Sequence, residues 1–157
     1  MRYDTLPLIA DLYIPALLLS IAVILCKRPH KAKALMALGI SMIGVYGIRV
    51  LDQFTSLWPR AGWDYSTHTA FAAVCVWFLW RNLRHVIWPW SLAGYFALMI
   101  HLRYHTLADI LSTLAVIALW ISLQEKMLPR HRAVKNDSLN SSQSPAYERD
   151  RNLDHRR

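Results

Sequence analysis

The sequence predicts an all-α integral membrane protein, a helical bundle of about five transmembrane helices. Three observations lead to this fold class. The 157 residues are 55% hydrophobic, and the apolar residues gather in long runs separated by short polar loops. Basic residues flank these runs, and tryptophans lie mostly near their ends, as in the aromatic belts of membrane proteins. The length allows a single domain.

Each apolar run is taken as one candidate helix, because a helix needs about 20 mostly apolar residues to span a bilayer. The five runs are residues 6–26, 34–50, 69–80, 86–102 and 105–123. The first is predicted to be a retained membrane helix. Asp4 and Asp11 stand where a cleaved signal peptide has basic residues, and the run is too long for one. The third is short and can extend back through Ser66.

Charge sets the expected orientation of these helices. The loops at 27–33 and 81–85 are rich in Lys and Arg, whereas those at 51–65 and 102–105 have fewer. The positive-inside rule therefore places the basic loops in the cytoplasm and the other two at the opposite face. The net charge of +8 then reflects topology and contact with anionic lipid, and no nucleic-acid partner is expected.

The composition changes near the C-terminal end of the chain. Residues 1–125 form the expected transmembrane domain. Residues 126–157 are rich in Ser, Asn and charge, with almost no apolar pattern. We expect them to form a basic, disordered cytoplasmic tail. For a bacterial source, the expected location is the inner membrane, with the loops at 51–65 and 102–105 facing the periplasm.

Two histidines lie where an apolar run meets a polar loop. His68 precedes the third run, and His105 begins the fifth. Ionisable groups at such positions are costly in a membrane and are candidates for function. The predicted topology puts both at the same, non-cytoplasmic face, so we expect them to share a site. Asp11 is also unusual inside an apolar run, and it either lies near the outer face or pairs with an arginine of the site.

A carboxylate follows His105 at helical spacing. His105 and Asp109 are i and i+4, so they share a face if the segment is helical. A carboxylate there can hold the imidazole in one tautomer and raise its basicity, which makes the histidine a nucleophile or a base. The alternative is an inert polar pair that stabilises helix packing.

The same face offers candidates for binding phosphate. Ser66 and Thr67 can cap the start of a helix, and the free N–H groups of a helix start bind anions. Arg60 and Arg103 are near this face and can bind phosphate oxygens through two hydrogen bonds. They can equally serve as interfacial anchors. Together these residues predict a phosphoryl-transfer pocket.

Two segments resemble motifs of a known family. Residues 62–69, Gly-Trp-Asp-Tyr-Ser-Thr-His-Thr, resemble the Ser-Gly-His motif of the type 2 phosphatidic acid phosphatase superfamily, and especially its Ser-Gly-His-Thr form in the sphingomyelin synthase branch. Residues 105–109, His-Thr-Leu-Ala-Asp, resemble the His-x-x-x-Asp motif of that superfamily. The resemblance extends over residues 60–109.

The resemblance implies an enzyme that removes or transfers a lipid phosphoryl group with no metal and no cofactor. It implies that His105 attacks phosphorus and forms a phosphohistidine, that Asp109 orients His105 and that His68 protonates the leaving group. It also implies that Ser66 and Thr67 hold phosphate oxygens. Candidate substrates are phosphatidic acid, phosphatidylglycerophosphate, polyprenyl phosphates and phosphorylated lipid A, and transfer of a lipid headgroup is the alternative reaction.

The chain departs from the family pattern in its phosphate clamp. Thr67 replaces the usual glycine. The upstream Lys-x6-Arg-Pro motif is absent, with Arg49 and Arg60 as its only remnants. Met99 stands where the phosphatase branch has an arginine, and Arg103 is the candidate substitute.

Two further functions fit the same residues. In a metal or haem protein, His101, His105 and Asp109 would lie on one helical stripe, and His68 would add a ligand. In a non-enzymatic membrane protein, a decayed site would bind a partner or a lipid phosphate without turning it over.

Overall fold

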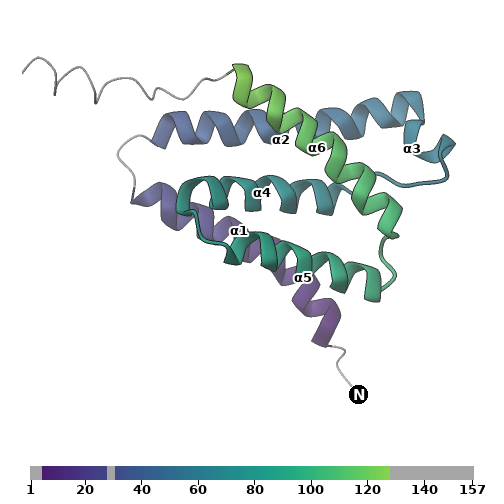
Figure 1. Cartoon of the computed structure of the whole chain (residues 1–157), viewed down its shortest axis with the longest axis horizontal. Coiled ribbons are helices and arrows are strands. Elements are labelled where there is room, and N and C mark those ends of the chain that lie inside the picture. Colours follow the sequence, from purple (N-terminus) through teal and green to yellow (C-terminus); the bar gives the residue numbers. More distant parts are fainter. Residues whose placement is uncertain (1–4, 28–30, 128–157) are drawn as a thin grey trace, which may run out of the picture. The chain divides into compact units, whose positions relative to one another are not determined.

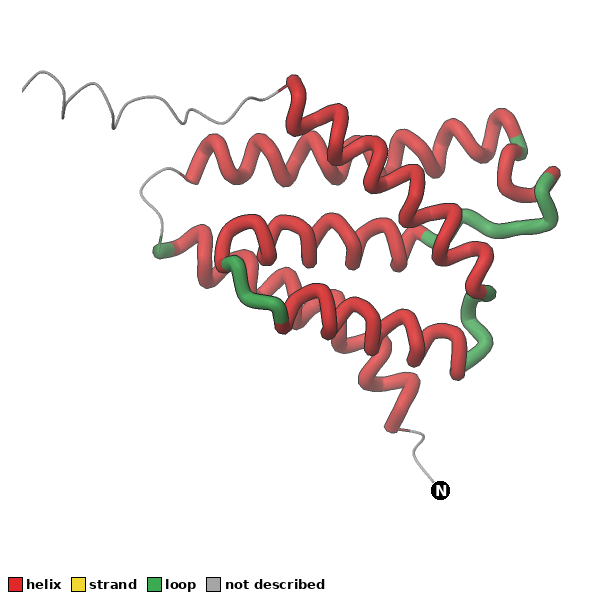
Figure 2. Tube along the Cα trace, in the orientation of Figure 1, coloured by secondary structure: helices red, strands yellow, loops and turns green. Residues whose placement is uncertain are grey.

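A computed structural model describes residues 5–27 and 31–127 of the chain, and the structural statements below refer to these residues. Figure 2 shows that they form helices joined by loops, with no strand among them. The all-helical fold class is therefore confirmed.

Six helices follow one another in the described part of the chain (Figure 1). They are α1 (Thr5–Cys26), α2 (Lys31–Thr55), α3 (Leu57–Arg60), α4 (Thr67–Leu83), α5 (Ile87–His101) and α6 (Leu107–Met127). Each predicted run coincides with one of the five long helices. The additional single turn, α3, lies within the predicted outer loop. α2 continues past its predicted end until Ser56 adopts a left-handed backbone with φ of 53°.

Three of these helices are long and apolar enough to cross a membrane: α1, α2 from Ala32 onward, and α6. α4 and α5 have 17 and 15 residues, fewer than the roughly 20 that a perpendicular span requires. The expectation of five spans is thus met, by length and composition, for three helices. Large apolar side chains such as Leu19, Ile43 and Phe54 are exposed, which is compatible with a surface that faces lipid.

α4 is the most buried helix of the described residues. α1, α2 and α5 all contact it (Figure 1). Ala70, Ala72 and Ala73 are buried on it, and such small side chains let neighbouring helices approach closely. α4 therefore fixes the positions of the helices that surround it, and its first turn carries His68.

α6 is attached to α2 by a buried polar cluster. The Ser41 hydroxyl donates to Gln124 Oε1 at 2.7 Å, and Gln124 Nε2 donates to the carbonyl of Ala37 at 2.7 Å. The indole of Trp120 lies so close to Gly44 that a Cβ at that position would collide with it. These contacts hold α6, and with it the loop before α6, against the rest of the helices.

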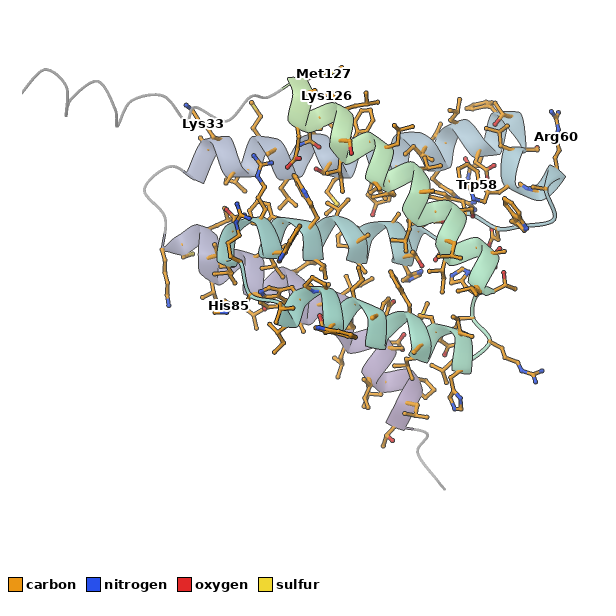
Figure 3. All side chains as sticks on the ribbon, in the orientation of Figure 1. Lys33, Trp58, Arg60, His85, Lys126 and Met127 are labelled. Atoms are coloured by element: carbon orange, nitrogen blue, oxygen red, sulfur yellow. The ribbon has the colours of Figure 1, made fainter. Side chains whose placement is uncertain are left out.

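The polar ends of the helices differ in their residues. In Figure 3, Lys33 and His85 lie at one end, whereas Trp58 and Arg60 lie at the opposite end. The basic loop 81–85 and the loop 51–65 are therefore at opposite ends, as the charge pattern predicted.

The chain divides into two compact units, Met1–Gln124 and Glu125–Arg157. The first contains both marked histidines. Of the second, only residues 125–127, the last residues of α6, are described. The predicted tail therefore lies outside the described residues from residue 128 onward.

Candidate functional site

The segment before α4 is fixed by two buried aromatic side chains. Trp58 Nε1 donates to Ser112 Oγ of α6 at 3.0 Å, and its ring meets Tyr65 edge to face. The Tyr65 hydroxyl donates to the carbonyl of Val45 at 3.0 Å. Burial raises the pKa of Tyr65, against the opposing effect of Arg49, so the hydroxyl stays protonated as this bond requires. The loop that precedes α4 is therefore anchored to α2 and α6.

Ser66 begins α4. Its hydroxyl accepts a hydrogen bond from the backbone N–H of Thr69 at 3.2 Å, and its own N–H donates to Thr113 Oγ1 at 3.2 Å. The prediction that Ser66 caps a helix is confirmed. Its side chain has no exposed surface, so the hydroxyl that the resemblance assigns to phosphate serves instead to start the helix.

The next two residues leave donors available. No hydrogen bond within the described part of the chain involves the backbone N–H groups of Thr67 and His68. Such groups at a helix start carry a partial positive charge. The donor available to an anion here is therefore the backbone N–H of Thr67, and not the hydroxyl of Ser66.

Asp109 forms a capping box with Thr106 at the start of α6. The N–H of Thr106 donates to Asp109 Oδ2 at 2.8 Å, and the N–H of Asp109 donates to Thr106 Oγ1 at 3.2 Å. The other carboxylate oxygen accepts from the N–H of Asp64 at 2.7 Å. Asp109 is 6% exposed. It therefore ties the loop before α4 to the start of α6.

This arrangement was present in the sequence as Thr106-Leu107-Ala108-Asp109, a capping-box pattern. From the spacing alone, the carboxylate is expected to pair with His105 instead. Because Thr106 caps α6, the helix begins at Leu107 and not at His105, so His105 and Asp109 do not form an i, i+4 pair on one helix. In the structure, Asp109 bonds to the backbone N–H beside His105.

His68 and His105 line one cavity of about 410 Å³. His68 comes from the first turn of α4 and is exposed, and His105 comes from the loop between α5 and α6 and is partly buried. Asp11 of α1 lines the same cavity. The remaining lining residues are Ala10, Ile14, Pro15, Tyr95, Met99 and Tyr104. The two histidines expected to share a site thus line one cavity. The sequence left the position of Asp11 open.

The structure does not bring the predicted arginines to this cavity. Arg60 is exposed at the end of α3, with its side chain directed away from the neighbouring helices (Figure 3). Arg103 is exposed in the loop after α5 and has a left-handed backbone, with φ of 56°. Arg49 is engaged by Asp52 at 3.7 Å and Asp64 at 3.9 Å. None of these guanidinium groups lines the cavity.

A second cavity of about 270 Å³ adjoins the first through shared residues. His68 and Ile14 line both. Tyr46, Thr67 and Phe71 complete the second one, whose surface is more apolar. His68 therefore borders both a cavity of mixed polar and apolar surface and a more apolar one.

The metal-binding alternative loses its geometric basis. The helical stripe of His101, His105 and Asp109 is not formed, because α5 ends at His101 and α6 begins only after Thr106. Within the described residues there is no group of three or more His, Cys, Asp or Glu side chains placed to hold a metal ion.

Comparison with known proteins found no match: no family model, no curated protein and no solved structure is similar to this chain. The class of protein is therefore inferred from its fold and its cavity. Its described residues form an all-helical fold with three helices long and apolar enough to span a membrane and a cavity lined by two histidines and a carboxylate.

Proposed function

We propose that this chain is a membrane lipid phosphatase that works through a phosphohistidine. One observation carries the proposal: His68 and His105, from segments far apart in the sequence, line the same cavity. Its volume of about 410 Å³ is within the range of roughly 300–1,000 Å³ typical of small-molecule sites. A nucleophile and a proton donor on one cavity are what a two-step phosphoryl transfer needs.

His105 is the proposed nucleophile. Its ring nitrogen attacks phosphorus, and the bond from phosphorus to the lipid oxygen breaks. The departing oxygen takes a proton from His68, which leaves a lipid alcohol and a phosphohistidine. Water then attacks phosphorus while His68 accepts a proton from it, the bond between phosphorus and the His105 nitrogen breaks, and inorganic phosphate leaves. No metal or cofactor takes part in this scheme.

Asp109 is proposed as a positioning residue. It holds the backbone of Thr106, next to His105, and the backbone of Asp64, on the segment that leads to His68. A single carboxylate thus links the loop that carries His105 to the segment that leads to His68. In this scheme Asp109 acts through the backbone, which differs from the orienting role implied by the family motif.

The phosphate oxygens are proposed to bind at the start of α4. The free N–H groups of Thr67 and His68 supply donors there. Since Arg60 and Arg103 do not line the cavity, the histidines and the helix start must balance the phosphate charge. Arg60 and Arg103 are then interfacial anchors.

The apolar helices support a substrate that resides in the bilayer. α1, α2 and α6 can each cross a membrane by length and composition, and the apolar second cavity reaches His68. For a bacterial source, we propose the inner membrane, with the cavity facing the periplasm. This places the reaction on lipids of the outer leaflet.

Phosphate release tests the proposal. The detergent-purified full chain is incubated with a panel of lipid phosphates in the presence of a chelator. We expect release by the native protein, none above background by His105→Ala and release reduced by about 10²–10⁴-fold by His68→Ala. His85→Ala is the matched control, because His85 lies at the other end of the helices (Figure 3). No release from any lipid, or equal release by His105→Ala, would contradict the proposal.

A further inference from the structure

Among the residues that the structure describes, Asp11 is the one carboxylate on the histidine cavity. It lies on α1 within the apolar sequence Leu8-Ile9-Ala10-Asp11-Leu12, and its side chain is exposed. It has no hydrogen bond or ion pair with any residue that the structure describes. A carboxylate in an apolar helix is costly unless it faces a polar cavity or a partner, and it marks a functional position by default.

Pro15 adds a second acceptor at the same place. It lies inside α1, one turn after Asp11, and it also lines the cavity. Proline has no N–H, so it cannot donate to the carbonyl four residues earlier, which is that of Asp11. The α1 wall, by which we mean Asp11 and Pro15, therefore combines a carboxylate with a backbone carbonyl to which Pro15 cannot donate.

These acceptors oppose the phosphate. A carboxylate repels a phosphate group, and the repulsion is stronger away from bulk water. We therefore expect the phosphate to bind at His68 and His105, which line the same cavity, and not against Asp11. What contacts the α1 wall must instead be a hydrogen-bond donor, because both groups on this wall only accept.

We propose that the α1 wall selects lipid phosphates whose headgroup carries a hydroxyl or an amine close to the scissile phosphate. Such a substrate presents phosphate to the histidines and a donor to Asp11. Phosphatidic acid and simple prenyl phosphates have no such donor and are poorer substrates. This inference rests on the proposed phosphatase function and names the substrate class of that site.

Three lipid phosphates test the selection, each presented in the same detergent micelles to the full-length protein. Phosphatidylglycerophosphate supplies a hydroxyl, sphingosine 1-phosphate supplies an amine beside a hydroxyl, and phosphatidic acid supplies neither. The measurement is the ratio of kcat/KM for each donor-bearing lipid to that for phosphatidic acid. We expect a ratio of roughly 10 or more for at least one of them, the usual effect of one charge-assisted hydrogen bond.

Variants of the α1 wall test whether Asp11 and Pro15 cause the difference in kcat/KM between the lipids. Asp11→Ala is expected to bring the ratio close to 1. Asp11→Asn, which keeps an acceptor oxygen but loses the charge, is expected to retain preference for a hydroxyl and to lose most of any preference for an amine. Pro15→Ala returns an N–H to the carbonyl of Asp11 and is expected to lower the ratio in part. Asp64→Asn is the matched control, since its carboxylate lies outside the cavity, and it should leave the ratio unchanged.

Each outcome decides the inference. Equal kcat/KM for all three lipids in the native protein overturns it, while the phosphatase function stands. A ratio that persists in Asp11→Ala also overturns it, because another group would then be selecting the substrate. If Asp11→Ala does not fold, the near-isosteric Asp11→Asn carries the test. No phosphate release from any lipid by the folded native protein removes the proposed function, and this inference with it.

Discussion

Asp109 bonds to backbone on two separate loops, and this explains how a carboxylate is tolerated at the start of an apolar helix. Its two oxygens accept from the N–H groups of Thr106 and Asp64 at 2.8 and 2.7 Å. Hydrogen bonds to a charged group contribute about 1.5–3 kcal/mol each, more than neutral ones. The residue is thus a structural anchor whose failure would displace His105 as well.

Replacement of this anchor should cost stability. Asp109→Ala leaves two backbone N–H groups without their partner, and we expect the free energy of unfolding to fall by at least about 2 kcal/mol. A thermal melt of the purified protein in detergent measures the change. Asp11→Ala is the control, because the side chain of Asp11 has no hydrogen bond or ion pair with the residues that the structure describes. A melting temperature of Asp109→Ala equal to that of the native protein would argue against the anchoring role.

At this scale the sequence predicted part of the site. His68 and His105 were found because ionisable residues at the ends of apolar runs are rare and need a reason. Asp11 could not be placed, because its presence on the cavity depends on how α1 packs beside α4 and α5, which no local pattern encodes. The sequence also did not show that Arg60 and Arg103 lie outside the lining of this cavity, because nearness in the topology does not determine where a long side chain points.

At the scale of elements, the contact between α2 and α6 depends on a small residue facing a large one. Gly44 leaves the space that the Trp120 indole occupies. One turn away, Ser41 and Gln124 share a buried hydrogen bond. α6 is therefore fixed against α2 by close packing and, one turn away, by a hydrogen bond. These contacts also fix the position of the capping box in the first turn of α6.

Two glycines of the same helix separate packing from helix propensity. Gly44→Ala places a methyl group against Trp120, and we expect it to destabilise the protein by about 1–3 kcal/mol, as overpacking does. Gly47→Ala meets no atom within 4 Å, so it should be neutral or stabilising by up to about 1 kcal/mol. Thermal unfolding in detergent compares them. Equal melting temperatures for the two variants would show that the Gly44 contact is not tight.

The helices themselves could be predicted from the sequence because each is a long apolar run between polar loops. Their ends could not, since they depend on particular side chains. Ser56 ends the α2 region with a left-handed backbone, and α3 forms there because the Asp52 carboxylate accepts from the N–H of Trp58 at 3.0 Å. Thr106 likewise moved the start of α6 past His105.

For the whole molecule, charge and apolar length favour one orientation in a membrane. The loop 81–85, which contains Arg81 and Arg84, lies at the opposite end from α3. By the positive-inside rule, we expect the former end to face the cytoplasm. The histidine cavity is lined in part by the first turn of α4 and the loop before α6, which lie at the opposite end of the helices from the loop 81–85 (Figure 1).

Accessibility of single cysteines tests this orientation. In a background with Cys26 and Cys75 replaced by alanine, Arg60→Cys should react with a membrane-impermeant maleimide on intact cells. His85→Cys should react only after the membrane is permeabilised. The reverse pattern would place the cavity in the cytoplasm, and equal labelling of both before permeabilisation would contradict a membrane-spanning arrangement.

The most direct measurement of the central claim is to trap the phosphorylated enzyme. The native protein is mixed briefly with a lipid whose terminal phosphate is radioactive, with a chelator present, and is quenched in alkali, in which phosphohistidine survives. Our account predicts label on the peptide that contains His105, no label in His105→Ala and slower loss of label in His68→Ala. The phosphohistidine mechanism would be contradicted if phosphate were released with no labelled protein and if His105→Ala released as much phosphate as the native protein.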